Sequence, residues 1–80
     1  MEATEFKSND FYLCACVLAC GIRLKRVERG EGKFMDFVFD DPECKAEQII
    51  ADHWDRRLKI PTRQLIEAIH ELKTRLHSGV

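Results

Sequence analysis

Ten apolar residues in a row, from Phe11 to Cys20, are the clearest feature of the hydrophobic pattern. The polar stretch Ser8–Asp10 precedes the run and Gly21 follows it, and helices favour such residues at the N-cap and just beyond the C-cap. The run therefore predicts a short helix. Because it is apolar on every side, we expect other elements to cover it, which places it at the centre of the core.

After Gly21 the pattern changes to the alternation of β-strands. Residues 22–28 and 33–39 predict two strands joined by a Gly30-Glu31 turn. One register matches opposite charges and apolar pairs on both faces. It places Ile22 opposite Phe39, Leu24 opposite Phe37, Lys25 opposite Asp36, Arg26 opposite Met35, Val27 opposite Phe34 and Glu28 opposite Lys33. One face of this hairpin packs on helices, and a mixed face that includes Val27, Phe34 and Val38 stays exposed.

Two helices are predicted after the hairpin. Asp41 suits the N-cap of the first helix and Pro42 its first helical position. The apolar stripe of this helix runs through Ala46, Ile49, Ile50, His53 and Trp54. The second helix is expected over 62–78, with Leu65, Ile69, Leu72 and Leu76 on one side.

These elements predict an α+β fold for one small domain over residues 1–80. The expected order is helix, strand, strand, helix, helix, with a two-stranded antiparallel hairpin packed on three helices. Residues 1–7 are expected to be loosely ordered. A chain of this size has a thin core that contributes about 3–5 kcal/mol of stability, which favours self-association and leaves little room for a deep pocket.

Composition narrows the function classes further. Thirteen basic and fourteen acidic residues give a net charge of −1, so any electrostatic function must come from local clustering. The first residues lack the basic segment of a signal peptide, and the apolar run is about half the length needed to span a bilayer. We therefore expect a cytoplasmic protein without a membrane segment, whose four cysteines are reduced.

The cysteines and histidines form no catalytic or metal-binding motif. Cys16 and Cys20 share a face of the first helix, but Cys14 points elsewhere and no second pair follows. Buried thiols explain these residues better than a metal site. No Ser-His-Asp, paired-carboxylate or phosphate-loop signature is present. The sequence therefore indicates a protein that is not an enzyme, with no cofactor, metal or small-molecule substrate.

The last helix and the hairpin suggest a protein interface. The seam of the last helix has coiled-coil spacing, and with the mixed hairpin face it could form a homodimer or bind a protein partner. Packing within the chain explains the same seam without a partner. The candidate interface residues are Ile69, Leu72, Leu76, Phe34 and Val38.

A basic cluster around the only tryptophan suggests a different partner. A tryptophan can stack on a base while neighbouring cations contact phosphates. The cluster comprises Trp54, Arg56, Arg57, Lys59 and Arg63. Interleaved acids such as Asp55 favour a solvated, salt-bridged surface instead, and the position of Trp54 on the apolar stripe favours burial.

Four segments resemble one known family. They are Phe6-Lys7-Ser8-Asn9-Asp10-Phe11-Tyr12-Leu13, Gly21-Ile22, Phe37-Val38-Phe39-Asp40 and Ala68-Ile69-His70-Glu71-Leu72-Lys73. The family consists of short bacterial, often phage-associated proteins catalogued only as a domain of unknown function. The resemblance implies a small accessory role in a mobile element and supplies no activity or site residue. The leading hypothesis is a non-catalytic binding module that associates with itself, and the alternative is a nucleic-acid-binding accessory protein.

Overall fold

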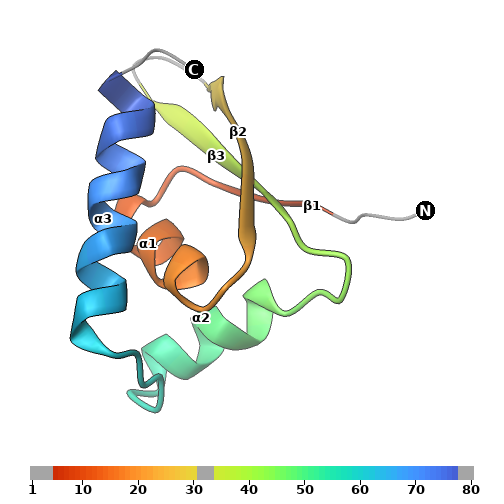
Figure 1. Cartoon of the computed structure of the whole chain (residues 1–80). Helices are drawn as coiled ribbons and strands as arrows, with labels where there is room; N and C mark the ends of the chain where they lie inside the picture. Colours follow the sequence, from red (N-terminus) through yellow and green to blue (C-terminus); the bar gives the residue numbers. More distant parts are fainter. Residues whose placement is uncertain (1–4, 31–33, 78–80) are drawn as a thin grey trace.

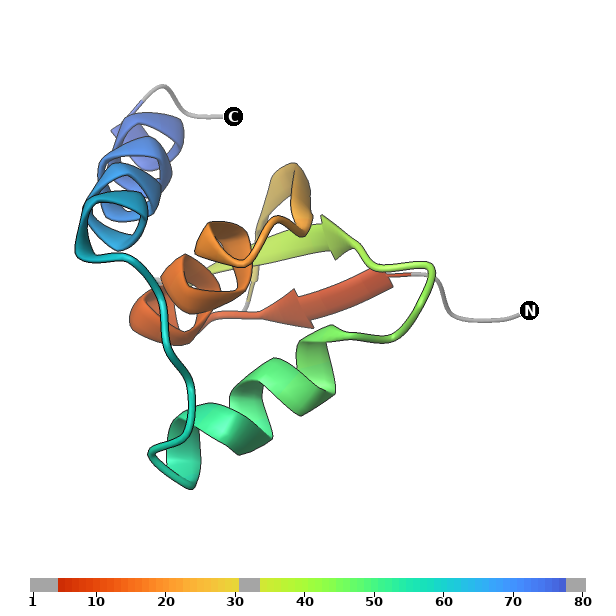
Figure 2. The ribbon, with the colours of Figure 1, turned by 60° about the horizontal axis from the view of Figure 1, so that its bottom comes forward.

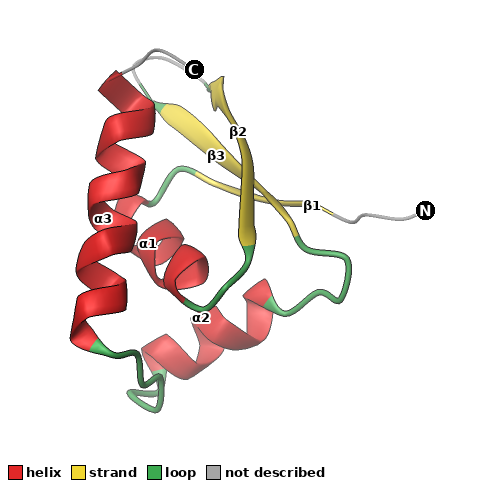
Figure 3. Cartoon of the chain, in the orientation of Figure 1, coloured by secondary structure: helices red, strands yellow, loops and turns green. Residues whose placement is uncertain are grey.

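Six elements follow one another in the order strand, helix, strand, strand, helix, helix (Figure 1, Figure 3). The computed structural model describes residues 5–30 and 34–77. The elements are β1 (Glu5–Ser8), α1 (Phe11–Ala19), β2 (Arg23–Arg29), β3 (Met35–Asp40), α2 (Ala46–Trp54) and α3 (Thr62–His77). The α+β class is confirmed, but the sheet has three strands where the pattern predicted two. None of the three helices described is long and apolar enough to cross a membrane.

Helix α1 begins and ends as its flanking residues predict. The Asp10 carboxylate accepts a hydrogen bond from the Leu13 amide at 3.2 Å. At the other end Gly21 has φ +98°, and its amide donates to the carbonyl of Leu18 while the Ile22 amide donates to that of Val17. This pair of bonds is a Schellman motif, which satisfies carbonyls that the last turn leaves without a partner.

The third strand is β1, which the hydrophobic pattern does not reveal. The strand order is β1-β3-β2, and both outer strands run antiparallel to β3. Strand β1 covers Glu5–Ser8, so part of the segment expected to be loosely ordered lies in the sheet. Phe6 pairs with Phe39, and their ring centroids are 6.1 Å apart. This aromatic contact ties the strand to the core.

The predicted hairpin register is wrong by two or three residues. Leu24 lies opposite Phe39 and Val27 opposite Phe37, with a β-bulge between Leu24 and Arg26. The extra residue lets Leu24 and Val27 face the core together, and both are buried. Glu28 lies opposite Asp36 rather than Lys33, and Gly30 donates to the Phe34 carbonyl at the turn. The remaining turn residues, including Glu31 and Lys33, lie outside the described residues.

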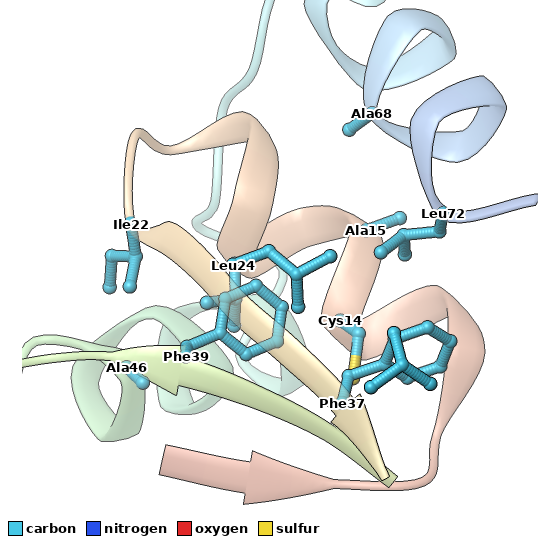
Figure 4. Packing of buried hydrophobic residues seen from close by; sticks show 11 residues of the cluster. Cys14, Ala15, Ile22, Leu24, Phe37, Phe39, Ala46, Ala68 and Leu72 are labelled. Carbon is cyan, nitrogen blue, oxygen red and sulfur yellow. The ribbon is translucent and has the colours of Figure 1, made fainter. Parts of the chain in front are cut away.

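The core forms where α1 lies between the sheet and α3 (Figure 2). In Figure 4, Leu24, Phe37 and Phe39 project from the sheet towards Cys14 of α1. Ala68 and Leu72 approach α1 from α3 on its other side. The prediction that α1 organises the core is therefore confirmed.

Helix α2 begins four residues later than the first helical position predicted for it. Lys45, not Asp41, occupies the N-cap, but the two carboxylate oxygens of Asp41 accept hydrogen bonds from the amides of Lys45 and Ala46 at 2.8 and 3.0 Å. Pro42 and Glu43 instead form a turn, and Cys44 follows with φ +55°. Only Ala46 of α2 is fully buried, so this helix is the least embedded of the three.

Candidate functional site

The connection between α2 and α3 begins with an unusual helix end. Arg56 has φ +63°, and its amide donates to the carbonyl of His53 at 3.1 Å. The next amide, that of Arg57, donates to the carbonyl of Asp52 at 2.8 Å. These bonds repeat the Schellman motif of α1, but an arginine occupies the position where glycine is usual. The left-handed backbone costs a non-glycine residue about 1–2 kcal/mol.

Trp54 is the last residue of α2 and projects into solvent. Its side chain is 67% exposed. The His53 ring stands edge-on to the indole, with centroids 4.9 Å apart. Ile49 and Ile50, earlier on the same stripe, are half-buried against the core. The interpretation of Trp54 as a core residue is therefore wrong.

The four cations of the cluster differ in how they are paired. Arg57 lies 3.3 Å from a carboxylate oxygen of Asp55, and Arg63 lies 3.6 Å from one of Glu67. Arg56 and Lys59 form no ion pair with any residue in 5–30 or 34–77. The structure thus brings an exposed indole and two unpaired cations together on one short segment. We call Trp54, Arg56, Arg57, Lys59 and Arg63 the basic patch.

A cleft of about 330 Å³ opens beside the basic patch. The connection between α2 and α3, the teal segment at the lower left of Figure 1, supplies three of its six lining residues. Most of its lining side chains are apolar, and the imidazole of His53 and the guanidinium of Arg56 complete the lining. The lining residues are Cys16, His53, Arg56, Leu58, Ile60 and Leu65.

The thiols of α1 are protonated at neutral pH. Burial raises the pKa of Cys16, and the charge of Asp10 raises it further. Burial also raises the pKa of Cys14 to about 12 and that of Cys20 above its ordinary value. A nucleophilic cysteine needs the opposite shift. Cys16 therefore presents a neutral, weakly polar surface to the cleft, although His53 lines the same space.

The histidines, cysteines and acids do not gather elsewhere into a ligand set. Within the part of the chain that the structure describes, no three or more of these side chains are placed to hold a metal ion. A second hollow, of about 570 Å³, is lined by residues of α3 alone. It includes Ile66 and Arg63 but lacks a second wall, so the cleft beside Trp54 is the better enclosed of the two.

The candidate protein interface is largely used within the chain. Leu72 is fully buried between α3 and α1, while Ile69 and Leu76 pack half-buried against the same core. Val38 was expected to be exposed, but only 1% of its surface is accessible. It lies between Lys7 and Arg26 on the neighbouring strands, whose aliphatic stems can cover it. Of the five residues, Phe34 alone is strongly exposed.

The face of the sheet turned away from α1 carries a second group of charges. Glu5 accepts from Lys25 at 2.7 Å and from Arg26 at 3.2 Å. Glu28 contacts Arg26 at 2.6 Å and Lys7 at 3.5 Å. These five residues form what we call the outer-face network. Lys25 pairs with Glu5 of the unpredicted strand, not with Asp36.

The cleft was not anticipated from the sequence. Its apolar lining from the connection comes from Leu58 and Ile60, which alternate with Lys59 before Pro61. That short alternation was a usable signal, because it indicates an extended segment with one apolar side. The contribution of Cys16 could not be foreseen, since it depends on how α1 meets the connection.

Comparison with known proteins identifies the family of the chain but gives no activity. A family model described as "Domain of unknown function (DUF5659)" matches residues 3–78. No curated protein and no solved structure matches the chain.

Proposed function

Because the chain belongs to the DUF5659 family, to which no function is assigned, we propose a function from the site: a non-catalytic module that binds nucleic acid through the basic patch. The observation that carries the proposal is the exposed indole of Trp54 beside Arg56 and Lys59, which form no ion pair with the described residues. Exposing a tryptophan forgoes about 1.5–3 kcal/mol of burial energy. An exposed indole among cations can stack on a base while the cations contact phosphates, which explains why Trp54 is not buried.

The local charge supports a polyanionic partner. The chain as a whole carries −1, yet residues 53–63 hold four basic side chains and a single acid, Asp55. Charges at this density attract phosphates through the release of counterions. Trp and Arg are also enriched at protein interfaces, so the salt dependence of binding, and not composition, distinguishes a nucleic-acid partner from a protein.

Self-association through the last helix has less support. Leu72 and Val38 are already buried in one chain, so neither can contribute surface to a dimer. A second copy would have to use scattered exposed groups such as Phe34 and Ile66. An accessory role in a bacterial or phage setting, inside the cytoplasm, agrees with a nucleic-acid ligand and forms part of the proposal.

The fluorescence of Trp54 tests the proposal directly, because it is the only tryptophan. Titration with single- and double-stranded oligonucleotides should give a saturable change in emission. If all four cations contact phosphates of a single strand, affinity should fall about 50-fold between about 50 and 200 mM salt.

Matched charge reversals assign the effect to the patch. Arg56→Glu should weaken binding and reduce the salt dependence, whereas Arg29→Glu, the same charge change on β2, should alter both much less. A flat titration with every oligonucleotide would reject nucleic acid as the ligand and turn the search to proteins. Equal losses in the two variants would show that binding does not involve the patch.

A further inference from the structure

Building on the proposed function, we infer that the cleft beside Trp54 receives one unstacked base of a single strand, so that the patch prefers single-stranded over double-stranded nucleic acid. The cleft and the indole belong to one continuous surface. His53 lines the cleft and also stands against the Trp54 ring, at 4.9 Å between centroids. A strand that stacks one base on Trp54 therefore passes the cleft mouth with its neighbour.

The size and lining of the cleft suit a flat ring. Its volume of about 330 Å³ lies at the small end of the range of about 300–1,000 Å³ that ligand pockets span. Leu58, Ile60 and Leu65 supply apolar walls, and the protonated thiol of Cys16 adds no charge. The apolar part of this lining accepts the face of a heterocycle, and Arg56 is left to contact the phosphate.

The charges at the cleft favour a ring attached to an anion. Arg56 is the only Lys or Arg among the lining residues, and no acid of the described chain pairs with it. Its guanidinium can contact the phosphate next to an inserted base. Arg56 is held there by its left-handed backbone, which anchors it in the Schellman motif at the cleft edge. Lys59, between the lining residues Leu58 and Ile60, does not line the cleft and is exposed to solvent.

Base insertion discriminates between nucleic-acid forms. The bases of a duplex are paired and stacked, and taking one out costs a few kcal/mol. An unpaired strand avoids that cost and can splay its bases onto aromatic and apolar surfaces. The cations alone would bind single-stranded and duplex nucleic acid alike. A preference for single strands would therefore indicate that the cleft takes part in binding.

Three labelled probes of equal length separate the contributions in the unmodified protein: an oligothymidylate, an abasic deoxyribose-phosphate strand, and a duplex. Fluorescence anisotropy at one salt concentration should show the oligothymidylate binding about tenfold or more tightly than either other probe. Trp54→Ala removes only the stacking platform and should leave part of this preference. That remainder belongs to the cleft.

Filling the cleft should remove the part of the preference for oligothymidylate that remains without Trp54. Leu58→Phe and Ile60→Phe each place a ring in the proposed base site, and two variants guard against misfolding of one. Ile66→Phe adds the same bulk on an exposed part of α3 outside the cleft and serves as the control. We expect the preference for oligothymidylate over the abasic strand to drop severalfold in both cleft variants and not in the control.

The outcomes distinguish this inference from the function on which it rests. Binding of all three probes with equal affinity and steep salt dependence would overturn base insertion while leaving nucleic-acid binding intact. An unchanged preference in a folded cleft variant would also overturn it. No binding of any probe would reject both.

Discussion

The outer-face network and the basic patch both hold several basic side chains, yet they are built in opposite ways. On the sheet, Lys25 and Arg26 lie against Glu5, and Arg26 also contacts Glu28. On the α2–α3 connection, Arg56 and Lys59 have no such acid in the described chain. The first arrangement satisfies its charges within the protein and covers Val38, whereas the second pairs Arg57 and Arg63 but leaves Arg56, Lys59 and Trp54 to the solvent. The contrast indicates that density of basic residues alone does not identify a binding surface.

The largest effect that sharpens this contrast is on stability. Val38→Ala should lower the free energy of unfolding by about 2 kcal/mol, because it removes two buried methyl groups and leaves a cavity beneath the outer-face network. Ile66→Ala, at a side chain that is 50% exposed, should cost about 0.5 kcal/mol or less. Urea unfolding measures both. Equal costs would mean that the outer face of the sheet is not a packed surface.

A smaller effect is expected from Arg56→Gly, which should raise the stability of the fold but weaken nucleic-acid binding. Arg56→Gly relieves the left-handed backbone at φ +63° but adds the chain entropy of glycine, so we expect a net gain of about 0.5–1 kcal/mol. The same change removes a cation that pairs with no acid of the described chain and should weaken nucleic-acid binding. Urea unfolding and oligonucleotide titration of one protein sample test both signs. Cys44→Gly, at the other left-handed position, should stabilise the fold without weakening binding, and a loss of binding there would point to a general effect of α2.

The smallest effect is a pH dependence confined to the outer-face network. Hydrogen bonds from Lys25 and Arg26 lower the pKa of Glu5, and the bond from Arg26 lowers that of Glu28. A carboxylate whose folded pKa lies below its unfolded value stabilises the protein above the ordinary value of 4.5 and loses that contribution as the pH falls through the folded pKa. We therefore expect the urea midpoint to fall below about pH 4.5.

Glu5→Gln should flatten that fall, and Glu71→Gln, at an exposed position on α3, should not. High salt should shrink the difference between the two variants, because exposed ion pairs are screened. An identical pH profile for both variants would mean that the ion pairs of the outer face contribute nothing measurable to folding.

Local signals explain why parts of this fold could be predicted. The caps of α1 lie within a few residues of the helix, so Asp10 and Gly21 determine its ends. The range of α3 was predicted to within one residue of its observed end at His77, since its apolar spacing persists over four turns. Asp41 accepts hydrogen bonds from the first amides of α2, although the turn through Cys44 moved the N-cap itself to Lys45.

Long-range signals explain what could not be predicted. Strand β1 is four residues long and its partner β3 lies far along the chain, so no local pattern reveals it. Without β1, Lys25 was matched with Asp36 across a Gly30-Glu31 turn, and that pairing belongs to the wrong register. Val38 was taken as exposed for the same reason, because Lys7 on its far side was unplaced. For the basic patch, the sequence supplied the residues but not the exposure of Trp54, which depends on where α2 leaves the core.

The place of β1 in the sheet also has a consequence for the order of folding. On the ribosome β1 is made first, but the strand it pairs with emerges only after α1 and β2. The β2–β3 hairpin closes a short loop, whereas the β1–β3 pairing closes a much longer one and is expected to form more slowly. Until then Phe6 has no partner, and the flanking charges Glu5 and Lys7 help to keep the waiting strand from pairing with other chains. The segment that joins the outer-face network to the core is therefore expected to be the last strand to dock.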